Sequence, residues 1–243
     1  MNLALVLASL FFVGSVLGWC LELLFRNIVH RSEKIINPGF CTGPYLPIYG
    51  FGLCTLFLLA SLEEKSVIAD PFWNRVALVV AMGVGMTAIE YIAGLFCLKY
   101  LKVRLWDYSD LWGNIQGIIC PIFSLAWAVL GAMYYFLVHP YILDGLAWLS
   151  QNLAFSFFIG MFFGIFILDV AHSAQVVVRL KRFAEENDVI VRYEALKTHI
   201  RENLEKNNAK YHFFRPFRSE RPMLEYLKEM QEDLEKRIHF KKK

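Results

Sequence analysis

The amino-acid sequence predicts an all-α, polytopic integral membrane protein with about five transmembrane helices and a basic cytosolic tail. Hydrophobic residues make up 57% of the 243 residues and charged residues only 19%, against about 45–50% and about 25% in soluble proteins. The apolar residues also lie in blocks of about 20, the length that spans a bilayer. This composition excludes a soluble domain and, for most of the chain, intrinsic disorder.

Five apolar segments are the predicted spans: 2–25, 43–62, 73–98, 114–138 and 153–178. No basic residues precede the first apolar core, so we do not expect a cleavable signal peptide. The second span has an irregular start, because 43–50 holds two prolines and two glycines and proline breaks the helical hydrogen-bond ladder. Irregular backbone at membrane depth persists only when it is buried in protein or lines a wet cavity. A kinked helix start and a short re-entrant turn both fit.

The distribution of Lys and Arg predicts the orientation. Loops 26–40 and 99–113 each hold three such residues, loop 63–72 holds one and loop 139–152 holds none. By the positive-inside rule the N-terminus lies outside and the C-terminus in the cytoplasm. The C-terminal segment 179–243 holds 17 Lys and Arg against 12 Asp and Glu. It either binds anionic lipid or simply follows the positive-inside rule.

The sequence therefore divides into a transmembrane helical bundle, 1–178, and a basic amphipathic tail, 179–243. We expect the fifth span to continue into a cytosolic helix, followed by a turn at Pro216 and Pro222 and a second helix that folds back. The segment 211–218 mixes aromatic and basic residues, which fits a headgroup anchor or an aromatic plug between the helices. The apolar positions that recur every three or four residues are Val189, Tyr193, Leu196, Ile200 and Leu204, then Met223, Leu227, Met230, Leu234 and Ile238.

The five cysteines are predicted to be reduced packing residues, since they form no CxxC pair and lack zinc-site spacing. They are Cys20, Cys41, Cys54, Cys97 and Cys120.

Ionisable residues inside the spans are the most informative feature of the sequence. Glu22, Glu90, Asp169 and His172 all fall in the cytoplasmic half of their spans. A charged residue at the centre of a span costs about 2.5–3.5 kcal/mol on insertion scales, so such residues usually face the interior of a bundle. Small residues share the face of each glutamate, which predicts helix contacts there.

We therefore expect the inner helix faces to enclose a polar pocket open to the cytoplasm or the inner leaflet. The alternative is that Glu22 and Glu90 are protonated or hydrogen-bonded and only hold helices together. Asp169 and His172 are spaced to form a local hydrogen-bonded pair, whereas a metal site would need Glu22 or Glu90 to converge on the same ion.

The loop between the third and fourth spans, 100–114, carries Trp106, Tyr108 and Trp112, which are typical of a membrane interface. Asp107 lies between two of these aromatic residues. The loop either caps the pocket or is an aromatic belt with a turn.

Several ordered motifs resemble the bacterial ABC-transporter type IV membrane family, over roughly residues 10–175. They are Gly18-Trp19-x-x-Glu22, Asn37-x-Gly39-Phe40-x-x-Gly43-Pro44-x-x-Pro47-Ile48-Tyr49-Gly50-x-Gly52, Thr87-x-x-Glu90-Tyr91, Trp106-Asp107-Tyr108-Ser109 and Asn114-x-x-Gly117-x-x-Cys120-x-x-x-Ser124-Leu125-x-Trp127. The resemblance implies a permease-like subunit of the bacterial inner membrane, without a settled substrate or reaction.

Two positions depart from the family pattern. Pro38 and Ile118 stand where the family usually has basic residues, which weakens any expectation of an anion site. The sequence holds no Walker A motif, so ATP hydrolysis would require a separate ATPase subunit.

The leading functional hypothesis is a permease-like component whose pocket carboxylates bind a cation or a proton. Five spans make a small pore, so a homodimer or a partner docked on 179–243 is expected.

The alternative is a membrane-embedded enzyme that acts on a lipid-borne or small substrate at the inner leaflet, although no GxSxG or HExxH motif is present. A structural or regulatory role ranks third. No cofactor is assigned, and membrane lipids rather than nucleic acid are the expected partners. The candidate binding residues are Glu22, Glu90, Asp107, Asp169, His172, Trp19, Gly43, Pro44, Pro47, Tyr49, Tyr91, Trp106, Tyr108, Asn114 and Ser124.

Overall fold

The computed structural model describes residues 2–29, 36–63, 68, 70–206, 213–214 and 227. The chain divides into two compact units. Unit 1 comprises Met1–Glu22, Pro44–Leu95 and Asp107–Leu168, and unit 2 comprises Leu23–Gly43, Phe96–Trp106 and Asp169–Lys243. Each unit is built from segments that are distant in the sequence.

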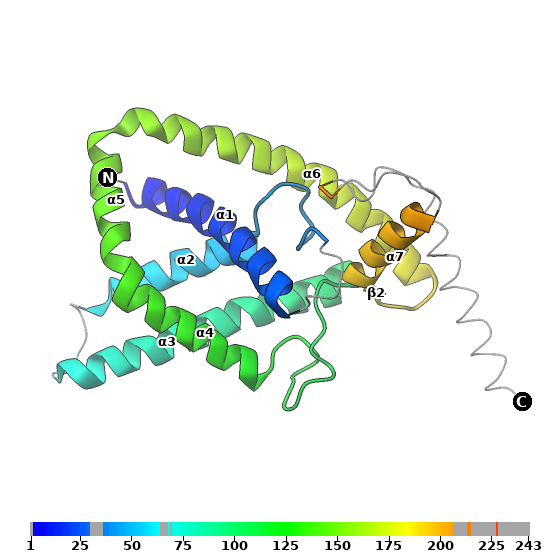
Figure 1. The fold of residues 1–243 in the computed structure, drawn as a ribbon, viewed down its shortest axis with the longest axis horizontal. Coiled ribbons are helices and arrows are strands. Elements are labelled where there is room, and N and C mark those ends of the chain that lie inside the picture. The colour runs from blue at the N-terminus through cyan, green and yellow to red at the C-terminus, as the bar shows by residue number, and fades with distance from the viewer. Residues whose placement is uncertain are drawn as a thin grey trace, which may run out of the picture. The chain divides into compact units, whose positions relative to one another are not determined.

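Helices dominate the described residues, as the sequence predicts (Figure 1). Short π-helical or 3-10 segments (η) continue or precede several of them. The elements are α1 (Leu3–Val29), α2 (Pro47–Ala60), α3 (Pro71–Phe96), η2 (Cys97–Leu101), β1 (Val103–Arg104), α4 (Pro121–Met133), η3 (Tyr134–Val138), α5 (His139–Gln151), η4 (Leu153–Phe155), α6 (Ser156–Glu186), β2 (Val191–Arg192) and α7 (Tyr193–Lys206).

Four helical stretches among the described residues are long and apolar enough to cross a membrane: Leu3–Ile28, Pro71–Leu101, Pro121–Gln151 and Leu153–Glu186. Helix α2 is apolar but has only 14 residues. At 1.5 Å per residue it is roughly 21 Å long, which is short of the roughly 30 Å hydrocarbon core. The structure therefore confirms a mostly helical chain, whose described residues hold four long candidate spans and one shorter apolar helix, and the count of five spans stays a prediction.

The predicted boundaries of the fourth span were wrong at both ends. The helix begins at Pro121 rather than at 114, because the preceding loop turns through positive φ angles at Gln116 (55°) and Gly117 (67°). The predicted loop 139–152 is instead helix α5, which continues from α4 through η3. Pro140 lies in the first turn of α5, directly after the π-helical segment η3.

Within unit 1, α2 packs closely against the first half of α1 (Figure 1). Leu46 is extended, and the helix begins at Pro47. The Leu46 N–H group donates to the Ser15 carbonyl (2.9 Å), near the middle of α1, and Cys54 Sγ lies 3.3 Å from the Leu7 carbonyl oxygen. These contacts show that α2 runs antiparallel to α1 from its midpoint toward its N-terminus.

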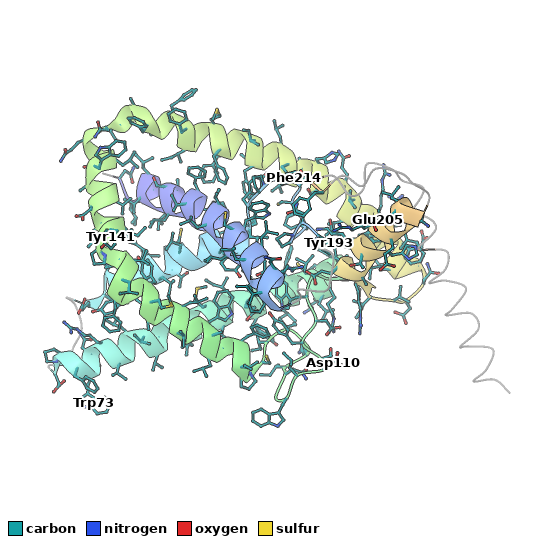
Figure 2. All side chains as sticks on the ribbon, in the orientation of Figure 1. Trp73, Asp110, Tyr141, Tyr193, Glu205 and Phe214 are labelled. Atoms are coloured by element: carbon teal, nitrogen blue, oxygen red, sulfur yellow. The ribbon has the colours of Figure 1, made fainter. Side chains whose placement is uncertain are left out.

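Glycine permits this close approach of α1 and α2. A methyl group at Gly18 would lie 2.2 Å from Cβ of Tyr49, which is shorter than any normal contact. Most of the other buried residues of unit 1 are apolar. Trp73 and Tyr141 lie outside this interior and point away from their helices (Figure 2). The buried cluster that joins α2, α3 and η3 consists of Leu56, Ala60, Leu78, Met82, Met86, Tyr134 and Tyr135.

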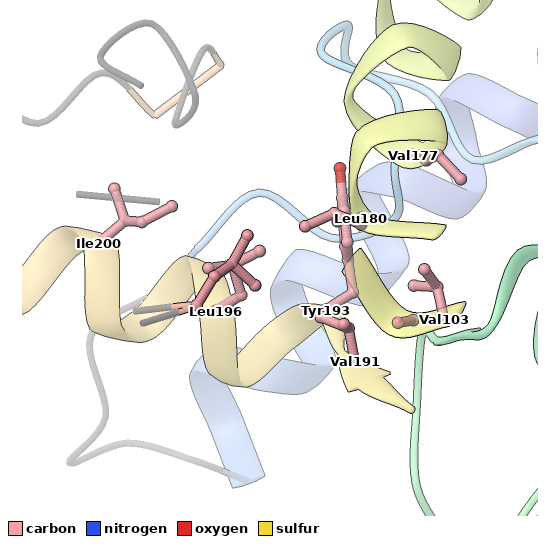
Figure 3. Close-up of a cluster of buried hydrophobic side chains, with 9 residues drawn as sticks. Val103, Val177, Leu180, Val191, Tyr193, Leu196 and Ile200 are labelled. Carbon is pink, nitrogen blue, oxygen red and sulfur yellow. The ribbon is translucent and has the colours of Figure 1, made fainter. Parts of the chain in front are cut away.

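Unit 2 is organised around a two-stranded parallel pair, with Val103 beside Val191 and Arg104 beside Arg192. Helix α6 ends at Glu186 and α7 begins only at Tyr193. The expected helix through Val189 is therefore interrupted by a turn, in which Asp188 has a φ of 50°, and by β2. Apart from Leu227, the predicted second tail helix lies outside the described residues, and so does most of 211–218. The buried cluster (Figure 3) consists of Val103, Val177, Leu180, Ala184, Val191, Tyr193, Leu196, Ile200 and Leu227.

Candidate functional site

Glu90 is a deeply buried carboxyl group of unit 1, with 3% of its surface exposed. It lies on α3, and two neutral side chains bind it. Trp127 Nε1 on α4 donates to Oε2 at 2.9 Å, and the Tyr108 hydroxyl donates to Oε1 at 3.0 Å. Each carboxyl oxygen therefore has a donor, and neither donor carries a positive charge.

Glu22 on α1 belongs to the same cluster. The Tyr49 hydroxyl on α2 donates to Glu22 Oε2 at 2.9 Å. The Tyr49 ring in turn meets the Trp127 ring edge-on, with centroids 5.6 Å apart. Glu22 and Glu90 also lie close enough to interact electrostatically. We call Glu22, Tyr49, Glu90, Tyr108 and Trp127 the carboxylate cluster.

The loop between η2 and α4 positions Tyr108. The Tyr108 N–H group donates to the Gly117 carbonyl at 2.9 Å, and its ring stacks on Phe123, with centroids 4.5 Å apart. Asn114 holds the loop together, because its Nδ2 donates to the Leu111 carbonyl (2.8 Å) and its Oδ1 accepts from the Gly117 N–H group (3.0 Å). Burial and the nearby Glu90 carboxylate raise the pKa of Tyr108 well above its usual value, so Tyr108 remains a hydrogen-bond donor at physiological pH.

In unit 2, two oppositely charged side chains hold residues 37–43, which we call the clamped loop. Asp169 on α6 accepts hydrogen bonds from the Thr42 N–H group (3.1 Å), the Gly43 N–H group (2.8 Å) and the Thr42 hydroxyl. Lys197 on α7 donates to the carbonyls of Asn37 (2.9 Å) and Gly39. Asp169 therefore binds backbone donors of this loop, and Lys197 binds its acceptors.

Burial governs the ionisation of the groups around the clamped loop. Lys197 is 2% exposed, and loss of solvation lowers its pKa from 10.5 to about 7. Burial also raises the pKa of the Cys41 thiol to about 12, so this cysteine is a protonated packing residue at physiological pH. Arg26 pairs with Glu194 on α7 (2.5 Å) and adds a second contact to the same helix.

The structure places the sequence-predicted residues in different surroundings. Glu22, Tyr49, Glu90 and Tyr108 meet in the carboxylate cluster, and Asn114 orders the neighbouring loop. Asp107 accepts hydrogen bonds from the backbone and hydroxyl of Ser109 in a local turn. Trp19, Pro44, Pro47, Tyr91 and Ser124 belong to unit 1, whereas Gly43, Trp106, Asp169 and His172 belong to unit 2. A common pocket that includes Asp169 and the pairing of Asp169 with His172 stay predictions.

Sequence reasoning did not select Trp127 or Lys197 as site residues. Trp127 lies three residues after Ser124, on the polar stripe of its helix, so its position was a usable signal. Lys197 follows Tyr193 by four residues and precedes Ile200 by three, which places it on the apolar face of α7. Within the described residues, no group of three or more His, Cys, Asp and Glu is arranged to hold a metal ion.

These features define a polytopic helical membrane protein with a buried carboxylate cluster between its helices. Residues 9–174 match the family described as "Putative ABC-transporter type IV", so the chain belongs to this family. No curated protein and no solved structure is significantly similar to the chain.

Proposed function

We propose that this protein is a permease-like membrane subunit of a transporter and that Glu22 and Glu90 bind a proton or a small cation. The observation that carries this proposal is the convergence of two intramembrane carboxyl groups in one cluster. Buried charges inside a bilayer are costly, and they typically mark ion or proton pathways.

The partners of Glu90 support this role. Trp127 and Tyr108 orient the carboxyl group but contribute no positive charge, and Glu22 adds a second carboxyl group nearby. Two adjacent carboxyl groups in a poorly solvated site do not both stay ionised without compensation. A proton shared between them, or a cation bound by them, supplies that compensation.

The proposed topology has five passages, with the N-terminus outside and the C-terminus in the cytoplasm of the bacterial inner membrane. The extended residues before Pro47 together with α2 form the second passage, in which a short helix covers only part of the membrane. Broken helices of this kind are common where transporters bind ions. In keeping with the family name, a separate ATPase subunit is the proposed source of energy. The chain is proposed to assemble as a homodimer or with a cytosolic partner that binds 179–243.

Infrared spectroscopy of the purified protein in nanodiscs tests proton binding. We expect a protonated carboxyl band that persists at neutral pH in the wild type and is lost or shifted in Glu90→Gln and Glu22→Gln. Asp110→Asn is the matched control, because Asp110 is an exposed acidic residue of the same unit. If both Gln variants give the same spectrum as the wild type, neither carboxyl group of the carboxylate cluster binds the proton, and the proposal is contradicted.

Transport is tested in proteoliposomes with a pH-sensitive dye and an imposed ion gradient. Flux that both Gln variants reduce by about tenfold or more, at equal protein content, supports the proposal. Equal flux in the wild type and the variants contradicts it. If the wild type instead modifies vesicle lipids and Glu90→Gln does not, the cluster belongs to the alternative, a membrane-embedded enzyme with a carboxyl acid or base.

A further inference from the structure

The two hydrogen bonds of Glu90 differ in where they allow a proton to bind. Trp127 Nε1 lies 2.9 Å from Oε2, and the Tyr108 hydroxyl lies 3.0 Å from Oε1. An indole N–H group only donates, whereas a phenolic hydroxyl donates or accepts. Oε2 therefore faces a hydrogen atom, and Oε1 faces an oxygen atom that can accept a hydrogen bond from a protonated carboxyl group. This geometry favours Oε1 as the atom that binds a proton.

The same two neighbours disfavour a metal cation. A hard cation such as Mg²⁺ or Ca²⁺ takes about six or more oxygen ligands, and the Trp127 N–H group presents a hydrogen atom with a partial positive charge instead. A proton needs one lone pair and one acceptor, which Glu90 Oε1 and the Tyr108 hydroxyl supply. The surroundings of Glu90 therefore suit a proton better than a metal cation.

Close packing of α3 against α4 restricts the approach to Glu90 from one side. At Gly83, about two turns before Glu90, an added methyl group would lie 2.8 Å from Ala128 Cβ. At Gly131, about one turn further along α4, an added methyl group would lie 2.9 Å from Met82 Cβ. The two helices therefore touch on the side of Glu90 that is away from the loop between η2 and α4. The loop side is the favoured route to the carboxyl group.

Tyr108 connects the buried carboxyl group with that loop. Its side chain is half-buried, whereas Ser109 and Asp110, which follow it, are exposed. Stacking on Phe123 fixes its ring, and the side chain also lies close enough to Glu22 to interact electrostatically. The pKa of Tyr108 lies well above its usual value, chiefly because of burial. The hydroxyl therefore stays neutral, and it can pass a proton only by exchanging one hydrogen atom for another.

We propose that the ion bound by Glu90 is a proton on Oε1 and that the Tyr108 hydroxyl is the group through which this proton enters and leaves. On release, the Oε1–H bond breaks and the tyrosine oxygen takes the proton. In the same step the tyrosine gives its own hydroxyl proton to a water molecule, which becomes hydronium, and the phenol stays neutral. Trp127 positions the carboxyl group and keeps Oε2 as the carbonyl oxygen. This inference rests on the function proposed for the carboxylate cluster, and it narrows the ion to a proton.

Infrared spectroscopy of the full-length protein in nanodiscs tests the route. Glu90→Gln assigns the carboxyl band of Glu90, and transfer into heavy water then shifts this band to lower frequency as the proton exchanges. We expect this exchange to be about tenfold or more slower in Tyr108→Phe than in the wild type. Tyr100→Phe, at an exposed tyrosine, is the matched control and should exchange like the wild type.

The direction of the change separates this route from a structural role. If Tyr108 only ordered the loop, its loss would admit water and leave exchange as fast as in the wild type or faster, and that result would overturn the route. Should Tyr108→Phe fail to fold, replacement of Tyr108 by 3-fluorotyrosine decides, because it keeps the ring and makes the hydroxyl more acidic. The exchange rate should then differ from that of the wild type, and an unchanged rate contradicts the route.

The identity of the ion and its position have their own tests. Sodium, potassium or magnesium chloride, added at constant pH and ionic strength, should leave the Glu90 band in place, and loss of the band in any of them would refute a site for protons alone. Trp127→Phe should move the band to higher frequency, because the carbonyl oxygen loses its hydrogen bond, and an unchanged frequency contradicts the assignment of Oε2. A wild type without a Glu90 carboxyl band would contradict proton binding by Glu90 altogether, whereas a band with normal exchange in Tyr108→Phe contradicts only the route.

Discussion

The two units bury charged groups in opposite ways. In unit 1, Glu90 is held by neutral side chains, Tyr108 and Trp127. In unit 2, Asp169 and Lys197 carry opposite charges and bind the backbone of the same loop. A side chain that binds backbone groups fixes a loop to the rest of its unit, whereas a carboxyl group with neutral donors can exchange a proton without releasing any backbone group. The comparison predicts a structural role for the charged side chains of unit 2, and it supports the function proposed for the carboxylate cluster.

The largest expected effect comes from Asp169→Ala. This change leaves the N–H groups of Thr42 and Gly43 without their acceptor. Hydrogen bonds to a charged group contribute about 1.5–3 kcal/mol each, so we expect a loss of about 2–4 kcal/mol in the free energy of unfolding. Thermal melting in detergent measures it, with Gln175→Ala, an exposed position on the same helix, as the control. Equal melting temperatures for the wild type and Asp169→Ala would contradict the structural role.

Gly18→Ala tests unit 1 in the same assay. The added methyl group would lie 2.2 Å from Tyr49 Cβ, so α1 and α2 must separate, at a cost of about 1–3 kcal/mol. The control is Gly164→Ala on α6, where a methyl group meets nothing within 4 Å and the higher helix propensity of alanine should be neutral or stabilising. If Gly18→Ala and Gly164→Ala have the same melting temperature, the close packing of α1 against α2 does not stabilise this part of unit 1.

Lys197 makes the free energy of unfolding of unit 2 depend on pH. Its pKa in the folded protein, about 7, lies below the ordinary value of 10.5, so the unfolded chain binds more protons between these values. Stability should therefore rise with pH above about 7, by up to about 1.4 kcal/mol per pH unit. The groups that act on Lys197 are Glu194, Arg26 and Cys41. Above about pH 9 the raised pKa of Cys41 acts in the opposite sense, which makes pH 7–9 the useful window.

Melting curves of the wild type and Lys197→Met across that window isolate this contribution, because every other group is common to both proteins. The stability of the wild type relative to Lys197→Met should increase from pH 7 to pH 9. A constant difference would show that Lys197 does not change its protonation state in this range.

The sequence predicted those parts of the fold and site that depend on helical periodicity and on the cost of charge in a membrane. Glu22 and Glu90 were selected for these reasons, and both belong to the carboxylate cluster. Helix α5 was missed because the predicted fourth span ended at residue 138 and 139–152 was taken as a loop, whereas the helical stretch runs on to Gln151.

The contacts of Tyr108 and Lys197 could not be predicted, because they depend on irregular loops. Tyr108 reaches Glu90 only because residues 108–117 fold back through the left-handed φ angles at Gln116 and Gly117. Lys197 binds carbonyl groups 158 and 160 residues away in the sequence. Neither geometry leaves a periodic pattern in the sequence.

The smallest expected effect, and the sharpest test of the comparison, comes from Tyr108→Phe. This variant keeps the stacked ring on Phe123 and removes one donor to Glu90, at a cost of about 1 kcal/mol. If Glu90 carries the proposed proton, the carboxyl band should move to higher frequency, because one hydrogen bond to the carboxyl group is lost. Tyr100→Phe, an exposed tyrosine, is the control and should leave the band unchanged. A melting temperature that falls as far as in Asp169→Ala, with no change in the band, would instead make the carboxylate cluster a structural element like the clamped loop.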